Sequence, residues 1–511
     1  VLAGDRPRGT LYAVYTYLED YAGCRWWAPD AEYIPKKPTL KLANMNYVYK
    51  PPFFYRETFY GSVRASNPFA VKLKCNGHFE RIPEELGGHL SIIGWCHTFD
   101  QIMPRSKYFA SHPEWYSLRD GSRYSSYGQL CLTNREMREE FIKNALERIR
   151  KNPSAGVISI SQNDNRLYCQ CPECTAAANK LGNQTDLMLD FVNEVARAVK
   201  KEFPKFKIVT LAYTYTTDPP VTVKPDENVI ISLCTVSCNF AQPLNSDANS
   251  KFHSQINGWN KITNQLFIWD YTTNFTTLQI PHPNYYMMLN NIKFFSKSGA
   301  IGIFSQGDIG NRETDFQMLR AWVVSKLQWN PNLDANKLVD EYLRGYYGAA
   351  GPYMKQILDT YIGAANRENV YLGCYMAGNP YFKAADYIKA FGLFDKAHAA
   401  ETDPSIRERI KTQRRSLELS LYLNSSAVED QVVASGLIAH VDIDKWSRDY
   451  YDWATSTHND YFKEGGKLTF SKFMSLGLAS MNTPKSEKTP RACAGLADDD
   501  WVELQEDIAT L

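Results

Sequence analysis

Short apolar runs alternate with amphipathic segments between residues 51 and 345. Such alternation is typical of repeated β-α units, in which a buried parallel strand reads as a continuous apolar run. We predict eight strands and therefore a (β/α)8 barrel of the TIM type, in the α/β class. The strands are expected at residues 53–58, 90–95, 129–133, 157–161, 208–213, 229–233, 266–269 and 301–304.

Two segments between these runs have a clear helical period. Asn134 is suited to cap a helix that runs to about Lys151. A second helix is expected from about Thr185 to Phe203, because apolar residues recur there at three- and four-residue steps. Its buried face is predicted to consist of Met188, Phe191, Val192, Val195 and Val199.

The pattern changes on both sides of the predicted barrel, which spans residues 51–345. Residues 1–50 predict a partial α/β domain with a helix at 11–21, and a group of prolines at 35–52 marks its boundary. Residues 346–480 contain no strand-like runs, so we predict a helical domain that includes one long helix at 404–430. Residues 481–511 are expected to form a linker and an acidic tail.

Composition excludes several classes of partner. The 511 residues carry 57 Lys and Arg against 56 Asp and Glu, a net charge of +1. This balance gives no large electrostatic field that would attract nucleic acid or an anionic membrane. No run of residues is apolar enough to span a bilayer. Aromatic residues make up 13% of the chain, and flat rings are suited to stack on the apolar faces of sugars. The chain opens with Val1, which indicates a processed or trimmed start.

Candidate chemistry gathers where the predicted strands end. In barrel enzymes the catalytic residues lie at the carboxyl ends of the strands. The fourth strand is followed by Gln162 and Asp164, our catalytic candidates. Amides, carboxylates and rings together suit a carbohydrate site, although each singly is compatible with a structural role, such as a buried Arg56–Glu57 salt bridge. The candidate substrate-binding residues are Arg56, Glu57, His97, Asn163, Tyr213, Tyr215, Trp269, Asp270, Tyr271 and Gln306.

Cysteines cluster directly after the fourth strand, at Cys169, Cys171 and Cys174. Thiolates at this spacing bind zinc when a fourth ligand is present, but no second pair is evident. His97, Cys96 or Cys131 are the candidates for that ligand. We expect reduced or partly disulfide-linked thiols rather than a metal site, and no cofactor.

Five motifs in order resemble a bacterial family known as domain of unknown function 4838, which is similar to the core of glycoside hydrolase family 163. The motifs are at residues 23–29 (GCRWWAP), 96–99 (CHTF), 112–116 (HPEWY), 131–134 (CLTN) and 159–164 (SISQND). The resemblance implies a barrel with a helical C-terminal region. It also implies an exported bacterial endo-β-N-acetylglucosaminidase of gut symbionts that cuts the chitobiose core of complex-type N-glycans on glycoproteins.

Hydrolysis beside N-acetylglucosamine can use the 2-acetamido oxygen of the substrate as the nucleophile. The protein then supplies a general acid and a group that orients the acetamide. The resemblance places this pair at the end of the fourth strand, where Gln162, Asn163 and Asp164 stand. Gln162 cannot donate a proton as Glu does, which leaves three interpretations.

In the first interpretation Asp164 is the acid, and Asn163 or Gln162 holds the acetamide. In the second, Asp164 orients the acetamide and the acid lies on another strand, at Asp270, Glu57 or Asp308. In the third, Gln162 replaces a catalytic Glu in an inactivated form; this is our hypothesis from the sequence. Alternative functions are another barrel glycosidase, similar to α-glucuronidases and using Arg56 or His97 for an acidic sugar, or a non-catalytic glycan-binding protein.

Overall fold

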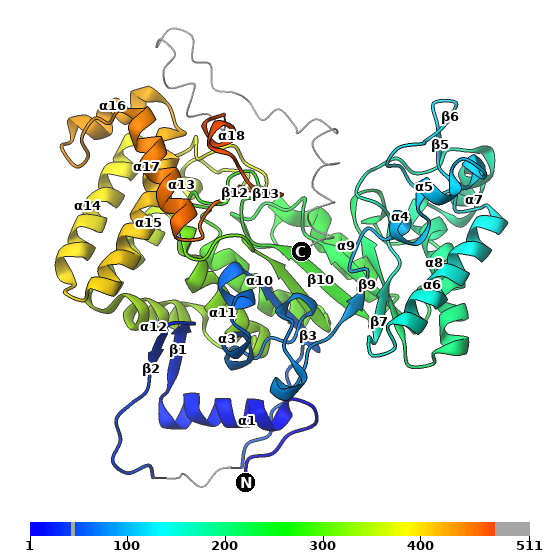
Figure 1. Cartoon of the computed structure of the whole chain (residues 1–511), viewed down its shortest axis with the longest axis horizontal. Coiled ribbons are helices and arrows are strands. Elements are labelled where there is room, and N and C mark those ends of the chain that lie inside the picture. Colours follow the sequence, from blue (N-terminus) through cyan, green and yellow to red (C-terminus); the bar gives the residue numbers. More distant parts are fainter. Residues whose placement is uncertain (42–45, 476–511) are drawn as a thin grey trace.

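The computed structural model describes residues 1–41 and 46–475. A curled sheet of seven parallel strands lies at its centre, in the order β3-β11-β10-β9-β8-β7-β4 (Figure 1). The strands are β3 (Tyr55–Phe59), β4 (Ile92–Ile93), β7 (Val157–Ser159), β8 (Lys207–Ala212), β9 (Val229–Cys234), β10 (Leu266–Tyr271) and β11 (Gly302–Gln306). The predicted α/β class and seven of the eight predicted strands are confirmed.

The prediction of a closed barrel of eight strands is wrong. Residues 129–133 contribute only an isolated antiparallel bridge between Leu130 and Tyr116, and β4 pairs directly with β7. The backbone of this segment is hydrogen-bonded to residues 115–117: Ser117 N donates to Gln129 O at 2.9 Å, and Cys131 N donates to Trp115 O at 2.8 Å. These bonds draw the segment out of the sheet, toward the small hairpin of β5 (Leu118–Arg119) and β6 (Ser122–Arg123).

The opening in the sheet lies between β3 and β4, and a loop around Asn76 covers it. The backbone N–H of Asn76 donates to Arg56 O at 3.0 Å, and the Asn76 side-chain oxygen accepts from Arg56 N at 2.9 Å. On its other side, Asn76 O accepts from Leu90 N at 2.9 Å, close to the start of β4. The loop therefore satisfies backbone groups that an open sheet edge would leave unpaired.

Apolar side chains fill the inside of the curled sheet. Tyr55, Phe267 and Phe304 contribute rings from β3, β10 and β11. The rings need space, and Gly302 on β11 provides it: a Cβ atom there would come within 2.6 Å of the Phe267 ring and 2.9 Å of Tyr55. The interior of the curled sheet is thus a packed core.

Helices cover the outside of the sheet (Figure 1). Both predicted helices are present as α6 (Arg135–Lys151), whose first turn is capped by the Asn134 side chain, and α8 (Gln184–Glu202). All five residues of the predicted α8 face are buried. The other helices of this region are α2 (Gly61–Arg64), α3 (Asn67–Lys72), α4 (Phe99–Ile102), α5 (Arg105–Tyr108), α7 (Pro172–Leu181), α9 (Ser250–Asn260), α10 (Tyr285–Lys297) and α11 (Gln317–Trp329).

The N-terminal region contains α1 (Gly9–Tyr17), which continues as a π-helical turn (Leu18–Ala22), and a hairpin of β1 (Arg25–Ala28) and β2 (Ala31–Tyr33). Gly23 ends the helix at φ 84°, a conformation that favours glycine. The hairpin lies beneath the sheet, next to α12 (blue and yellow-green in Figure 1).

The C-terminal region is mainly helical, as predicted, but it also contains a hairpin of β12 (Tyr461–Lys463) and β13 (Gly466–Lys467). The single helix expected at 404–430 is divided at residues 423–425, where the Asn424 side chain donates to Asn379 O and Phe382 O. The helices are α12 (Ala335–Tyr347), α13 (Gly351–Arg367), α14 (Ala384–Ala400), α15 (Pro404–Tyr422), α16 (Ser426–Ala434), α17 (Ile443–Ser456) and α18 (Phe470–Met474).

The predicted tail at 481–511 lies outside the described residues, and the domain boundaries remain predictions. None of the helices within residues 1–41 and 46–475 is long and apolar enough to cross a membrane.

A buried ion cluster joins the N-terminal region to the sheet. The Glu19 carboxylate contacts Lys74 Nζ at 3.0 Å and also Lys326 Nζ, and all three side chains are nearly inaccessible to solvent. Lys74 follows α3 and Lys326 belongs to α11, so one carboxylate connects three elements. Removing one partner of a buried pair leaves an uncompensated charge in the interior.

We therefore expect Glu19→Gln to lower the free energy of unfolding by about 3–5 kcal/mol. Glu32→Gln is the matched control, because Glu32 pairs with Lys72 at 3.4 Å on the surface and an exposed pair contributes less than about 1 kcal/mol. Urea unfolding followed by circular dichroism measures both variants. Equal stability losses would contradict the role given to Glu19.

Candidate active site

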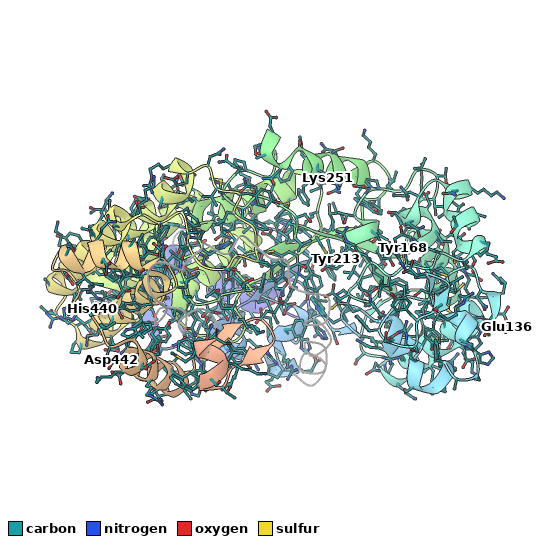
Figure 2. All side chains as sticks on the ribbon, turned by 90° about the horizontal axis from the view of Figure 1, so that it is seen from above. Glu136, Tyr168, Tyr213, Lys251, His440 and Asp442 are labelled. Carbon is teal, nitrogen blue, oxygen red and sulfur yellow. The ribbon has the colours of Figure 1, made fainter. Side chains whose placement is uncertain are left out.

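A cavity of about 500 Å³ opens at the carboxyl end of the sheet. Its position is that of barrel active sites, and its size is typical of small-molecule sites. Tyr213 lines it and lies near the middle of the molecule, between the yellow and orange helices and the cyan helices (Figure 2). Ten of the 24 residues that line it are aromatic: Phe59, Phe79, Trp95, Tyr213, Trp269, Tyr271, Phe275, Phe304, Tyr375 and Tyr461.

Asp164 reaches the cavity from the loop after β7. Its backbone N–H donates to the Tyr127 hydroxyl at 2.7 Å, and its side chain is hydrogen-bonded to Tyr213. Burial, together with the Asp164 charge, holds the pKa of Tyr213 well above its usual value. The Tyr213 phenol therefore stays protonated and donates to the carboxylate, which fixes the orientation of Asp164.

Glu464 supplies a second carboxyl group to the cavity, from the turn between β12 and β13. Tyr375 donates its hydroxyl to Glu464 Oε2 at 3.1 Å, and Gln306 donates from Nε2 to Glu464 Oε1 at 3.1 Å. Burial raises the pKa of Glu464 to about 7, and the nearby Asp164 charge acts in the same direction. Asp164 and Glu464 are the two carboxylic acids among the described residues that line the cavity.

A chain of two hydrogen bonds connects the sheet to the carboxyl group of Glu464. Trp269 at the end of β10 donates from Nε1 to Gln306 Oε1 at 2.7 Å, which turns the amide nitrogen of Gln306 toward Glu464. Because a glutamine amide can donate only from nitrogen, the Trp269 indole determines which end of Gln306 faces the acid.

The backbone after β4 has an unusual conformation where it borders the cavity. Trp95 and His97 adopt left-handed φ angles of 53° and 51°. Non-glycine residues in this region are costly and cluster at functional sites. His97 Nδ1 is 2.8 Å from Gln162 O, and the Trp95 ring is 5.5 Å from that of Trp269.

The structure brings only part of the predicted site together. The catalytic candidate Asp164 lines the cavity, as do the substrate-binding candidates His97, Tyr213, Trp269, Tyr271 and Gln306. The other candidates do not line it: Arg56, Glu57, Gln162, Asn163, Tyr215, Asp270 and Asp308.

The residues outside the cavity have structural partners that explain their positions. Arg56 packs under the sheet, where its guanidinium lies over the Tyr12 and Trp329 rings and donates to Phe53 O at 2.7 Å. Glu57 accepts from the backbone of His78 and Phe79. The two side chains thus have separate partners, and the salt bridge considered as a structural role for this pair does not form.

Four further candidates, among them Asp270 on β10, have partners that do not line the cavity. Asn163 donates to Gly128 O, and the Tyr215 ring packs on Tyr168. Asp270 accepts from the Thr235 hydroxyl at 3.0 Å, and Asp308 accepts from Asn311. Burial raises the pKa of both aspartates to about 7, so a shifted pKa alone does not mark the site here.

Gln162 is completely buried behind the cavity wall. Its amide nitrogen donates to Thr216 Oγ1 at 2.7 Å and to Tyr213 O at 3.2 Å. Tyr213 O also accepts from Thr216 N at 3.1 Å and from Thr216 Oγ1 at 3.0 Å, and the Gln162 amide adds a donor to this shared acceptor that a carboxylate would not supply. This placement argues against the hypothesis that Gln162 replaces a catalytic glutamate.

Sequence reasoning missed Glu464 and Tyr375, because the C-terminal region was taken as wholly helical. A signal was present: Gly465 and Gly466 lie between the alternating apolar residues of a short segment, which is typical of a β-hairpin. Both glycines adopt positive φ angles, 94° and 124°.

Comparison with known proteins gives a family and distant structural similarity. No curated protein matches the chain. The chain is similar to the family 89 glycoside hydrolase from Clostridium perfringens in complex with GlcNAc-α-1,4-galactose, with 11% identity and a TM-score of 0.45. That match covers 88% of this chain and 58% of the other, so the chain spans little more than half of that enzyme.

Two further solved structures are more distant. One is a GH138 enzyme targeting pectin rhamnogalacturonan II, with 11% identity, a TM-score of 0.34 and 72% of each chain covered. The other is the cellulose synthase subunit Z from Clostridioides difficile, with 12% identity, a TM-score of 0.29, and 47% of this chain and 76% of that chain covered.

The family described as "Domain of unknown function (DUF4838)" matches residues 26–359, well over half of the 511 residues, and the chain therefore belongs to that family.

Proposed function

We propose that the protein is a glycoside hydrolase in which Glu464 donates the proton and Asp164 is the partner carboxylate. The observation that carries this proposal is the composition of the cavity wall, where these two acids stand among aromatic rings. Glycosidases characteristically use two carboxyl groups around the scissile bond. Aromatic rings stack on the apolar faces of sugars.

The environment of Glu464 suits the acid role. A general acid must hold its proton near neutral pH, and burial raises the pKa of Glu464 to about 7. Tyr375 and Gln306 hold the carboxyl group in place at 3.1 Å each. Glu464 replaces the acid candidates Asp270, Glu57 and Asp308, since none of these lines the cavity.

The environment of Asp164 suits a group that contacts the sugar in a fixed orientation. The hydrogen bond between Tyr213 and the Asp164 side chain fixes the direction of the carboxyl group. In this position Asp164 would orient the substrate acetamide and stabilise the positive charge that develops as its oxygen attacks the anomeric carbon. Catalysis would then retain the anomeric configuration without a protein nucleophile.

The proposed substrate is the GlcNAc-β1,4-GlcNAc core of complex-type N-glycans. Support for this specificity comes from the five motifs of the sequence, two of which contribute residues to the cavity wall: Cys96 and His97 open the second motif, and Asp164 ends the fifth. With an N-glycoprotein as substrate, the protein would act outside the bacterial cytoplasm.

A second candidate function is hydrolysis of an acidic sugar. Arg64, Lys463 and Lys467 line the cavity and would attract a carboxylate of the substrate. From the sequence, Arg56 or His97 was expected to bind the acidic sugar. Arg56 lies outside the cavity, whereas His97 lines it. Release of products from glucuronosyl xylo-oligosaccharides, and not from N-glycoproteins, would favour it.

Removing either acid should abolish turnover. We expect Glu464→Gln and Asp164→Asn each to lower the release of glycan from a complex-type N-glycoprotein by about 10²–10⁴-fold, the contribution typical of an acid or base group. Mass spectrometry of the released glycans and of the protein, which would keep one N-acetylglucosamine per site, measures the reaction.

Two controls separate the roles. Asp270→Asn removes a buried carboxyl group outside the cavity and should retain most activity. On a dinitrophenyl glycoside, whose leaving group needs no proton, Glu464→Gln should recover activity while Asp164→Asn should not. Equal recovery of activity on this substrate by both variants would contradict the role of Glu464 as the acid. If the unaltered protein bound the glycan without hydrolysing it, the protein would be a glycan-binding protein.

The pH profile should report the Glu464 proton. Because the acid acts only when protonated, and its pKa is raised to about 7, kcat/KM should fall as pH rises above about 7. The measurement is kcat/KM against pH for the unaltered protein and for Glu464→Gln with the activated substrate, where this alkaline decline should be absent. A decline of the same midpoint in the variant would assign it to another group.

The Gln162→Glu variant should lose stability and gain no activity. The carboxylate would be buried against Tyr213 O, to which it has no proton to donate, at an expected cost of about 1–3 kcal/mol in the free energy of unfolding. Gln431→Glu, at an exposed position of α16, is the matched control and should be neutral. Appearance of glycan release only in Gln162→Glu would restore the inactivated-glutamate hypothesis.

A further inference from the structure

Four cysteines meet in the loop region next to the cavity. Cys131 comes from the segment before α6, Cys169 and Cys171 from the loop after β7, and Cys174 from the first turn of α7. All four are buried, and their sulfur atoms lie within 4.8 Å of one another. The sequence spacing identified Cys169, Cys171 and Cys174. The fold places Cys131 beside them, and Cys131 was one of the three candidates for a fourth ligand.

The distances fit a tetrahedral metal site. Cys131 Sγ is 3.7 Å from Cys171 Sγ and 3.7 Å from Cys174 Sγ. For sulfur ligands at about 2.3 Å from zinc, a tetrahedron has edges of about 3.8 Å. A disulfide requires about 2.05 Å between sulfurs, so these contacts do not correspond to a bond. All ten cysteines of the described residues are free thiols.

The groups around the sulfurs suit thiolates. Leu118 N–H donates to Cys169 Sγ at 3.3 Å, and Cys174 N–H donates to Cys171 Sγ at 3.4 Å. Arg123 donates from Nη1 to Cys169 Sγ at 3.8 Å and brings a positive charge. Such outer contacts orient metal ligands and stabilise their charge.

We propose that Cys131, Cys169, Cys171 and Cys174 bind one structural zinc ion. On binding, the four thiols release four protons and the Zn²⁺ ion forms four Zn–S bonds, which leaves a site of net charge −2 beside Arg123. No electron is transferred. All four positions are taken by protein ligands, as in structural zinc sites, and none of the four cysteines lines the cavity.

The ion would fasten together the two segments that hold Asp164. Gln129, two residues before Cys131, donates from Nε2 to Asn163 O at 2.8 Å and accepts from Asn163 N at 3.0 Å. Cys169 follows Asp164 by five residues. The zinc site therefore lies at the base of the loop pair, where it replaces the sheet pairing that residues 129–133 do not make.

Metal analysis of the full chain tests the proposal without reference to activity. After expression in zinc-containing medium under reducing conditions, inductively coupled plasma mass spectrometry should find about one zinc per chain, and a strong chelator should lower the melting temperature. Replacing the ion with Co²⁺ should give the visible absorption bands of a tetrahedral thiolate site.

Two serine variants provide the comparison. Cys131→Ser should lose at least about nine-tenths of the zinc, since three ligands do not form a closed site. Cys75→Ser should keep it, because Cys75 is equally buried but lies elsewhere, beside Thr58 and Ser325. Three results would overturn the proposal. The unaltered protein could take up no zinc after incubation with zinc, or it could contain iron instead of zinc. Mass spectrometry of native digests could also find disulfides among these cysteines. The unaltered chain decides these outcomes even when Cys131→Ser does not fold.

Discussion

The site depends on the docking of the β12–β13 hairpin on the rim of the sheet. The Asn311 side chain binds both backbone groups of Tyr461: its Nδ2 donates to Tyr461 O at 2.7 Å, and its Oδ1 accepts from Tyr461 N at 3.0 Å. Glu464 N also donates to Phe275 O at 2.8 Å. Gly310 lies against the Tyr461 ring, which leaves no space for a Cβ atom. These contacts place a residue from near the end of the described chain beside Gln306 on β11.

The open sheet explains why loops have so large a part in this structure. A closed barrel satisfies its edges by strand pairing, whereas here β3 and β4 each have a free edge. The Asn76 loop binds the backbone on both sides of the opening, at Arg56 and at Leu90. Elsewhere on the rim, the segment around Gln129 binds the loop after β7 through side-chain hydrogen bonds rather than through a strand ladder. The position of Asp164 is thus determined by contacts between loops. The four cysteines lie close to these contacts and would reinforce them by binding the proposed zinc ion.

The sequence predicted the elements with a regular period and missed those determined by tertiary contacts. Continuous apolar runs identified seven strands, and the three- and four-residue period identified α8, because burial on one face imposes these repeats. Residues 129–133 have the same apolar character as a strand, but their backbone pairs with residues 115–117 over a local hairpin. No local pattern distinguishes these two outcomes. The same limit applies to the candidate site. The ends of predicted strands pointed to Asp164, His97, Trp269 and Gln306, and these residues line the cavity. Side-chain direction was not readable: Arg56 packs under the sheet, and Glu464 belongs to no strand of it.

The packed interior finally constrains where the reaction can occur. Tyr55, Phe267 and Phe304 fill the space between the strands, so a charged group there would lose its hydration without a partner. The two acids that line the cavity stand at the rim, where Tyr213, Tyr375 and Gln306 supply hydrogen bonds. The rings below them continue into the cavity wall through Trp95 and Trp269. One apolar core thus supports the fold and forms the base of the surface on which a sugar ring would rest.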